Sequence, residues 1–207
     1  SERAVCQAEE IMAYITEEAG RESVALAKKR GNFPAYSESR FEQTTILHRR
    51  NATTTTIAPT GTISIIAGTT SGIEPLFAIA HVRHVLDGES LPEIHPLFLK
   101  IAKTEGFYTQ ELVEDIAKTG SIQTIASIPD EIKKIFKTSH DITPEWHIKI
   151  QAAFQKHTDN AVSKTVNFPA DATREDIRNV YLSAFQLGCK GVTIYRYGSR
   201  NKQVLNI

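Results

Sequence analysis

Apolar residues recur at helical spacing between positions 4 and 19 of the chain. This period predicts an amphipathic helix, which we expect Gly20 to end. A second, shorter helix is predicted over residues 22–30. The stretch 32–50 mixes aromatic and polar residues without a clear period, and we interpret it as an ordered loop.

Three segments have the composition of buried strands. Residues 52–58 are all β-branched or small, which is typical of a strand covered on both faces. Further strands are predicted over residues 163–168, closed by Pro169, and over residues 191–196. The dipeptide Asp87-Gly88 marks a turn.

Helical patterns fill most of the second half of the chain. Pro129 and Pro144 stand where a first helical residue belongs, and Thr143 is the expected N-cap before the second proline. Thr173 with Asp176 three residues later predicts a capping box. The order of strand, helices, strand, helix and strand predicts an α/β layer or barrel segment. Helices are predicted over residues 96–105, 109–119, 129–137, 144–157 and 174–187.

Composition is that of an ordinary globular protein. The 207 residues suffice for one substantial core or two small ones, with 41% hydrophobic and 23% charged residues. Lys plus Arg equals Asp plus Glu at 24 each, so bulk charge favours neither a nucleic-acid nor a membrane partner. No apolar stretch approaches the roughly 18 residues of a membrane span, and the first residues of this sequence do not have a signal-peptide pattern. We therefore expect a cytoplasmic protein.

Cysteine and histidine spacing predicts no metal site. Cys6 and Cys189 are the only cysteines, and they match no zinc or CxxC arrangement. Two distant thiols favour a reducing compartment over a disulfide, and we interpret Cys189 as a small inert hydrophobe. His81 and His84 lie three residues apart, but no third ligand stands at a suitable spacing nearby.

The most informative motif is the Pro-Thr-Gly turn within Ala58–Ser64. Gly61 allows close backbone approach, and a helix that begins there would point its amide groups at an anion. The hydroxyls of Thr60, Thr62 and Ser64 can converge on the same point, so a phosphate is the expected ligand. The motif is not a Walker loop, because no Gly-Lys-Ser/Thr follows. On the residues alone, a plain tight turn with locally bonded hydroxyls is an equal alternative.

Three further segments carry polar groups with an alternative structural explanation. Glu74, in Gly-Ile-Glu-Pro, is interpreted as a surface carboxylate without a chemical role. Residues 157–169 are dense in polar side chains where a helix gives way to a strand, which suits either a site or a well hydrogen-bonded connection. Residues 195–200 offer two guanidinium groups and two phenols, for phosphate contact, stacking or a plain turn.

Taken together and in this order, the segments resemble the adenosylcobalamin-dependent (class II) ribonucleotide reductases over essentially all 207 residues. The resemblance implies an α/β fold, namely a helix-rich partial segment of the ten-stranded α/β barrel of that family. Residues 1–207 would form one domain, the later portion of the barrel in a larger protein. The residues that carry the resemblance are 49–52, 57–64, 72–75, 157–165, 188–193 and 195–196.

The resemblance also implies a function and its residues. The complete enzyme would convert ribonucleotides to deoxyribonucleotides for DNA synthesis by thiyl-radical chemistry, with adenosylcobalamin as cofactor. Its partners would be a ribonucleoside di- or triphosphate and the remaining barrel, in cis or as a second chain, and a homodimer is left open. The substrate-phosphate-binding residues carried over are Thr60, Gly61, Thr62, Ile63 (by its backbone) and Ser64, and the active-site wall residues are Tyr195 and Arg196.

The chain departs from the family pattern where the radical chemistry resides. The Asn-Pro-Cys-x-Glu motif of the finger loop is absent, and neither cysteine has its context, so we assign no catalytic residue and expect the isolated chain to be inactive. Tyr197 stands where the family often has an acidic residue. The alternative is a non-catalytic module that binds nucleotide phosphates or a partner, as a split subunit or a stand-alone paralogue. A nucleotide hydrolase is disfavoured because no metal or base cluster is apparent.

Overall fold

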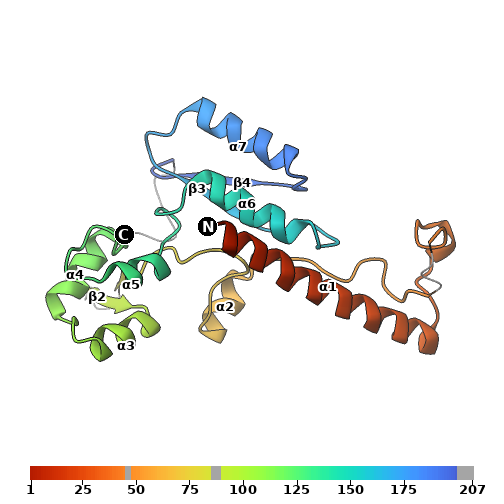
Figure 1. Cartoon of the computed structure of the whole chain (residues 1–207), viewed down its shortest axis with the longest axis horizontal. Helices are drawn as coiled ribbons and strands as arrows, with labels where there is room; N and C mark the ends of the chain where they lie inside the picture. The colour runs from red at the N-terminus through yellow and green to blue at the C-terminus, as the bar shows by residue number, and fades with distance from the viewer. Residues whose placement is uncertain (45–47, 85–89, 200–207) are drawn as a thin grey trace.

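The computed structural model describes residues 1–44, 48–84 and 90–199. Figure 1 shows the long first helix beneath a helix-and-strand layer, with a smaller lobe beside it. The helices are α1 (Glu2–Arg30), α2 (Gly61–Ala67), α3 (Pro96–Thr104), α4 (Gln110–Thr119), α5 (Asp130–Ile135), α6 (Pro144–Gln155) and α7 (Arg174–Gln186), with a short 3-10 helix η1 (Tyr36–Glu38). The strands are β1 (Ala80–His84), β2 (Ser90–Ile94), β3 (Thr165–Phe168) and β4 (Thr193–Arg196).

Helix α1 is continuous, so the prediction that Gly20 ends a first helix is wrong. The apolar stripe of α1 continues past the glycine to the buried Ala27, and α1 packs against α6. Burial of this stripe outweighs the helix penalty of one glycine, which is about 1 kcal/mol. The helix ends instead at Gly31, whose φ of 79° lies in the left-handed region and whose N–H donates to the carbonyl of Ala27.

The predicted strand over residues 52–58 is also wrong. The segment is extended, but only Ile57 forms a bridge, in parallel with Val162. Strand composition describes how a backbone fits a half-buried or buried surface, whereas a strand also needs a neighbour along its length. Among the described residues, that neighbour is present at a single position.

In the second half of the chain, the predicted helices are confirmed, with ends that differ by a few residues. Thr143 is the N-cap of α6, although its side chain makes no capping hydrogen bond, and Pro144 is the first residue. Pro129 is the N-cap of α5 rather than its first residue. The capping box of α7 is present in both directions between Thr173 and Asp176.

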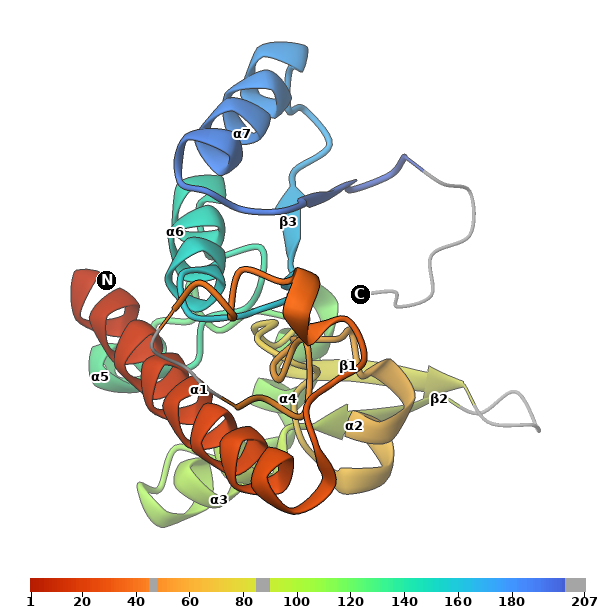
Figure 2. The same cartoon turned by 90° about the vertical axis from the view of Figure 1, so that its right-hand side faces the viewer.

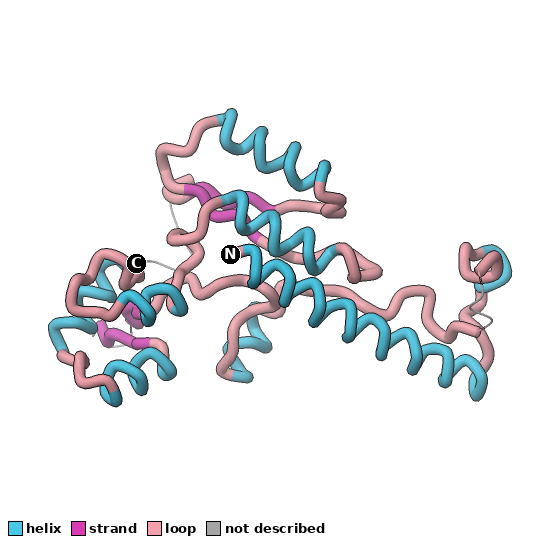
Figure 3. The backbone as a smooth tube through the Cα atoms, in the orientation of Figure 1, coloured by secondary structure: helices cyan, strands magenta, loops and turns pink. Residues whose placement is uncertain are grey.

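The helix-and-strand layer contains one of two apolar cores. Strands β3 and β4 confirm the predicted strands and pair in parallel, with Thr165 opposite Thr193 and Phe168 opposite Arg196. Helix α7 is the crossover between them, as a parallel pair requires. Figure 3 shows how little of the chain is strand. The buried members of this core are Ile148, Val166, Phe168, Val180 and Ala184.

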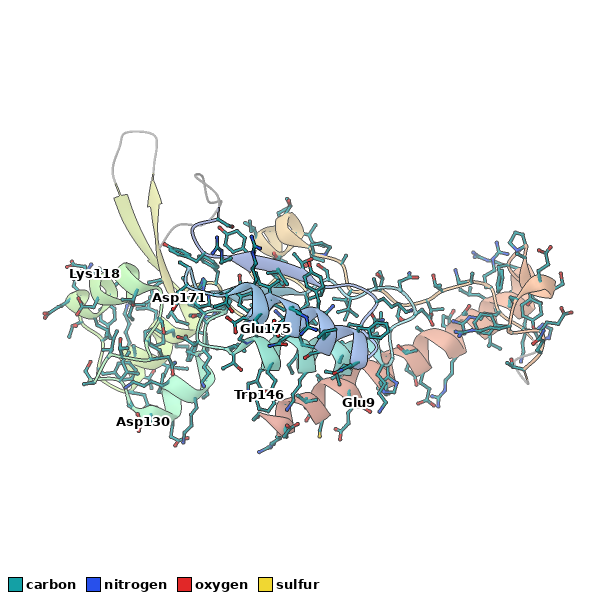
Figure 4. The ribbon with its side chains drawn as sticks, turned by 90° about the horizontal axis from the view of Figure 1, so that it is seen from above. Glu9, Lys118, Asp130, Trp146, Asp171 and Glu175 are labelled. Atoms are coloured by element: carbon teal, nitrogen blue, oxygen red, sulfur yellow. The ribbon has the colours of Figure 1, made fainter. Side chains whose placement is uncertain are left out.

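The smaller lobe contains the second core and a hairpin that the sequence pattern did not predict. Strands β1 and β2 pair antiparallel, with Ala80 opposite Ile94, and project from the lobe in Figure 2. The predicted Asp87-Gly88 turn lies outside the described residues. Helices α3, α4 and α5 enclose the fully buried Phe98 and Ile116. Figure 4 labels Lys118 and Asp130 on this lobe.

Within the described ranges, no helix is long and apolar enough to cross a membrane. The longest helix, α1, carries charged residues throughout its length.

Gly20→Ala should stabilise the protein, because Gly20 lies inside α1 and an added Cβ would meet nothing within 4 Å. The expected gain in the free energy of unfolding is about 0.5–1 kcal/mol. Gly31→Ala is the matched control and should destabilise, since its φ is +79°. Thermal unfolding followed by circular dichroism measures both, and a loss of stability in Gly20→Ala would contradict the continuous helix.

Candidate functional site

The Pro-Thr-Gly turn leads directly into α2, as the sequence predicted. Thr60 is the N-cap and adopts a left-handed conformation, with φ 52° and ψ 27°. It is the only non-glycine residue with positive φ in the described part of the chain. This conformation is strained for a β-branched residue and persists only where neighbouring contacts hold it. One such contact is a hydrogen bond in which the N–H of Gly72 donates to Thr60 Oγ1 at 2.8 Å.

The first amide groups of α2 are available for an anion. Ser64 N–H donates to the carbonyl of Thr60, which closes the first helical turn. The amides of Gly61, Thr62 and Ile63 precede that bond, so they have no acceptor within the helix. All three residues are exposed. A negative group placed beyond them would meet three N–H donors and the positive end of a short helix dipole.

The three hydroxyls of the motif do not share one environment. Ser64 is buried, and its Oγ donates to the carbonyl of Gly61 at 2.8 Å and lies 2.8 Å from Ser71 Oγ. The hydroxyl of Thr60 accepts the bond from Gly72. The structure thus uses two of the three hydroxyls inside the loop, while Thr62 lies at the surface.

A second segment, Ser71–Glu74, braces this loop. The N–H of Glu74 donates to the carbonyl of Ser71 at 2.9 Å. Gly72 has φ +50°, and a Cβ there would lie 3.0 Å from the carbonyl oxygen of Ala58. The segment therefore packs closely against the residues that enter the loop.

Glu74 is not an idle surface carboxylate, contrary to the interpretation from sequence. Its Oε2 accepts from Lys164 Nζ at 2.7 Å, and its Oε1 accepts from the N–H of Thr165 at 2.6 Å. The Lys164 side chain is 2% exposed. Its ammonium also donates to His147 Nδ1 at 2.8 Å and to the carbonyl of Thr165 at 2.6 Å. All three ammonium protons therefore have acceptors.

The His147 ring completes the network. Because Lys164 donates to Nδ1, the ring proton resides on Nε2, which donates to the carbonyl of Ser139 at 3.0 Å. Burial and the neighbouring ammonium lower the pKa of His147 to about 4. Burial also lowers the pKa of Lys164, against the hydrogen bond and charge of Glu74, which raise it. His147 is thus a neutral acceptor at physiological pH.

The polar stretch 157–169 forms a hydrogen-bonded connection. Asp159 Oδ2 accepts from the N–H and the hydroxyl of Thr54, at 2.7 and 2.9 Å, and from the buried Arg49 at 3.2 Å. The hydrogen bonds of Thr54 are among the causes that lower the pKa of Asp159, although burial opposes them as the largest effect. These contacts fasten the segment that precedes the Pro-Thr-Gly turn.

The other candidate residues lie elsewhere. Tyr195 and Arg196 end β4, where Arg196 Nη1 donates to the carbonyl of Ala170 at 3.4 Å. Figure 1 shows β4 in the upper layer and α2 below it. Cys6 and Cys189 are both free, and burial raises the pKa of Cys189.

No cluster of three or more His, Cys, Asp or Glu side chains able to hold a metal occurs among the residues that the structure describes. The side chains of His81 and His84 are not among them.

Comparison with known proteins identifies the family. The family model described as the ribonucleotide reductase barrel domain matches residues 1–195. The chain belongs to this family, and its fold is that of part of the barrel domain, helix-rich with few strands. A solved structure, the Actinobacillus ureae class Id ribonucleotide reductase alpha subunit, superposes with a TM-score of 0.80 at 26% identity. That match covers 96% of this chain and 35% of the subunit.

Two curated relatives are closer in sequence. A Thermoplasma acidophilum protein is 51% identical over 197 residues, which is 95% of this chain and 25% of the relative. A Mycobacterium tuberculosis protein (strain CDC 1551 / Oshkosh) is 48% identical over 206 residues, which is 100% of this chain and 29% of the relative. Both are named vitamin B12-dependent ribonucleoside-diphosphate reductase. The chain spans about a quarter of their length.

The free energy of unfolding should fall as the pH is lowered, because protonation of His147 favours the unfolded state. A histidine whose folded pKa lies below its unfolded value of 6.5 contributes stability that is complete above pH 6.5 and is lost as pH falls toward 4. From pH 8 to pH 5 the expected loss from this group is about 2 kcal/mol. His147→Gln, which does not titrate, should flatten that slope in urea unfolding measured between pH 5 and 8. His140 also has a lowered pKa, so His140→Gln is the control, with a smaller change in slope. An unchanged slope in His147→Gln would contradict the buried neutral ring.

Proposed function

We propose that this chain supplies the substrate-phosphate-binding wall of a vitamin B12-dependent ribonucleotide reductase. The observation that carries the proposal is the start of α2, where the amides of three exposed residues, Gly61, Thr62 and Ile63, lack helical acceptors. The names of the two curated relatives support the reaction class. The substrate is a ribonucleoside di- or triphosphate, which becomes a deoxyribonucleotide for DNA synthesis.

The roles of the loop residues follow from their surroundings. The three amides and the Thr62 hydroxyl would donate to phosphate oxygens and hold the nucleotide in register. Thr60 and Ser64 would act mainly by shaping the loop, because their hydroxyls already bond to Gly72, and to Gly61 and Ser71, respectively. Their contribution to phosphate affinity is therefore indirect.

The radical chemistry belongs to other parts of the complete enzyme. This chain has no Asn-Pro-Cys-x-Glu motif, so the cysteine that forms the thiyl radical lies outside it. Tyr195 and Arg196 would belong to the active-site wall of the assembled barrel. The rest of the barrel, in cis or as a second chain, is then the main partner. We also propose that the complete enzyme forms a homodimer and is located in the cytoplasm. The two free thiols of this chain suit such a reducing compartment.

Adenosylcobalamin is the cofactor that the relatives' names indicate for the complete enzyme. A pocket of about 460 Å³ lies between α6 and α7, over Phe168 and Val180. Pockets of roughly 300–1,000 Å³ suit drug-sized ligands, and a corrin with its nucleotide arms is larger. This pocket is therefore too small for the whole cofactor, and we assign none of its residues to it.

Thr62→Ala should weaken binding of a nucleoside diphosphate to the complete enzyme by about tenfold, because one charge-assisted hydrogen bond is lost. Thr62→Ala with Ser64→Ala should weaken it further by loosening the loop. Thr70→Ala removes an exposed hydroxyl beyond the other end of α2 and is the matched control. Calorimetry that gives unchanged affinity in the double variant would refute the phosphate site.

The second candidate function is a non-catalytic module that binds nucleotide phosphates or a partner chain, which the missing cysteine motif favours for the chain alone. The isolated chain, supplied with adenosylcobalamin and a dithiol, should form no deoxynucleotide. Mixing it with the rest of the barrel should restore product formation if it is part of a reductase. Turnover by the isolated chain would contradict our assignment of the radical cysteine to another segment, and no product from the mixture would favour the module.

A further inference from the structure

We propose that the ion pair between the partly exposed Glu74 and the buried Lys164 positions the phosphate-binding loop, so that Glu74 and Lys164 are positioning residues for nucleotide binding. The inference rests on the proposed function, because it assigns a purpose to contacts around the same loop. Neither residue touches the loop's free amides. Their effect is transmitted through the Ser71–Glu74 segment.

The pair is anchored firmly at its β3 end. Lys164 immediately precedes β3 and donates to three acceptors, on Glu74, His147 and Thr165. Glu74 also accepts the N–H of Thr165, the first residue of β3. Both carboxylate oxygens of Glu74 are therefore held by donors from one short stretch of chain. A carboxylate with this bidentate arrangement has little freedom to move.

The other end of the connection reaches the loop through three hydrogen bonds. Glu74 N–H bonds to the carbonyl of Ser71, whose hydroxyl lies 2.8 Å from that of Ser64. The adjacent Gly72 N–H bonds to the hydroxyl of Thr60 at 2.8 Å. Thr60 and Ser64 flank the three free amides of α2. The chain of contacts therefore runs from β3 to both sides of the phosphate-binding loop.

Close packing makes this connection stiff. Gly72 lies so near Ala58 that even a methyl group would be only 3.0 Å from the carbonyl oxygen. A shift of the Ser71–Glu74 segment toward the loop would cause a collision, and a shift away from it would break the bonds to Thr60 and Ser64. Small helices gain little stability from their own hydrogen bonds, so the seven-residue α2 depends on such bracing.

A purely structural ion pair is the competing explanation. If the pair only stabilises the protein, its loss should weaken the binding of pyrophosphate and of the nucleoside to the same extent. The two explanations therefore differ in ligand selectivity. Inorganic pyrophosphate reports on the loop alone, whereas the matching nucleoside reports on the remainder of the substrate site.

The test is Glu74→Gln in the complete reductase that contains this segment. Glutamine keeps the shape but has only one acceptor oxygen, so its amide N–H group must face either the Lys164 ammonium or the Thr165 amide. We expect the inhibition constant of pyrophosphate and the KM of the nucleotide to rise about tenfold. The inhibition constant of the nucleoside and kcat should stay within about twofold. Equal changes for pyrophosphate and nucleoside, or no change for either, would overturn the positioning role.

Two further variants make the result interpretable. Leu112→Ala opens a cavity in the core of the smaller lobe and should lower the melting temperature without altering the pyrophosphate constant. Ser71→Ala leaves the Glu74–Lys164 pair intact and removes only the link to Ser64, so we expect a two- to fourfold rise in the inhibition constant of pyrophosphate. If Glu74→Gln does not fold, Ser71→Ala decides: an unchanged constant overturns the inference.

The same assay separates this inference from the proposed function. Weak pyrophosphate inhibition in Thr62→Ala together with normal inhibition in Glu74→Gln would overturn the positioning role alone. Normal inhibition in both variants would remove the phosphate site itself.

Discussion

The buried ammonium group of Lys164 is the contact on which the arrangement of the site depends. It joins Glu74 beside the loop and His147 on α6 to the start of β3, where it also donates to the carbonyl of the adjacent Thr165. Loss of the Glu74 carboxylate would leave the buried Lys164 ammonium without its counter-charge, and an uncompensated buried charge costs about 3–5 kcal/mol. The network therefore fixes how the α2 loop sits relative to the parallel strands.

A second set of contacts acts in the same direction. Arg49 and Asp159 fasten the extended segment that leads into the Pro-Thr-Gly turn. The loop is thus held from the residues before it, through Asp159, and from the residues after it, through Glu74. Both anchors lead to the stretch between α6 and β3. That stretch, which the sequence marked only as rich in polar groups, is the structural centre of the site.

Features governed by neighbouring residues were predictable from the sequence, and features governed by distant ones were not. Proline and capping signals located α6 and α7 because their physical basis lies within one turn of helix. The continuation of α1 past Gly20 depended on burial of Ser23 and Ala27, and Ser23 bonds to the distant Arg50 and Asn51, which no local pattern contains. For the same reason, residues 52–58 had strand composition but lacked strand partners.

The same distinction between local and distant interactions applies to the candidate site. The start of a helix at Gly61 followed from the Pro-Thr-Gly turn and its flanking residues. The engagement of Glu74 did not, since its partner stands 90 positions later. The one available signal was its position between an apolar residue and a proline, which suits a carboxylate that points inward. Isolated carboxylates of that kind are too common for the signal to decide.

The left-handed backbone of Thr60 sets a limit on how this loop can change. A glycine there would relieve conformational strain of about 1–2 kcal/mol, but it would also remove the hydroxyl that receives the Gly72 amide, a bond of about 0.5–1.5 kcal/mol. The two effects nearly cancel, so we expect Thr60→Gly to change the free energy of unfolding very little. What glycine would alter is rigidity, because the loop would gain backbone freedom and lose a tether in the same step. Threonine at this position therefore keeps the loop rigid at the cost of backbone strain.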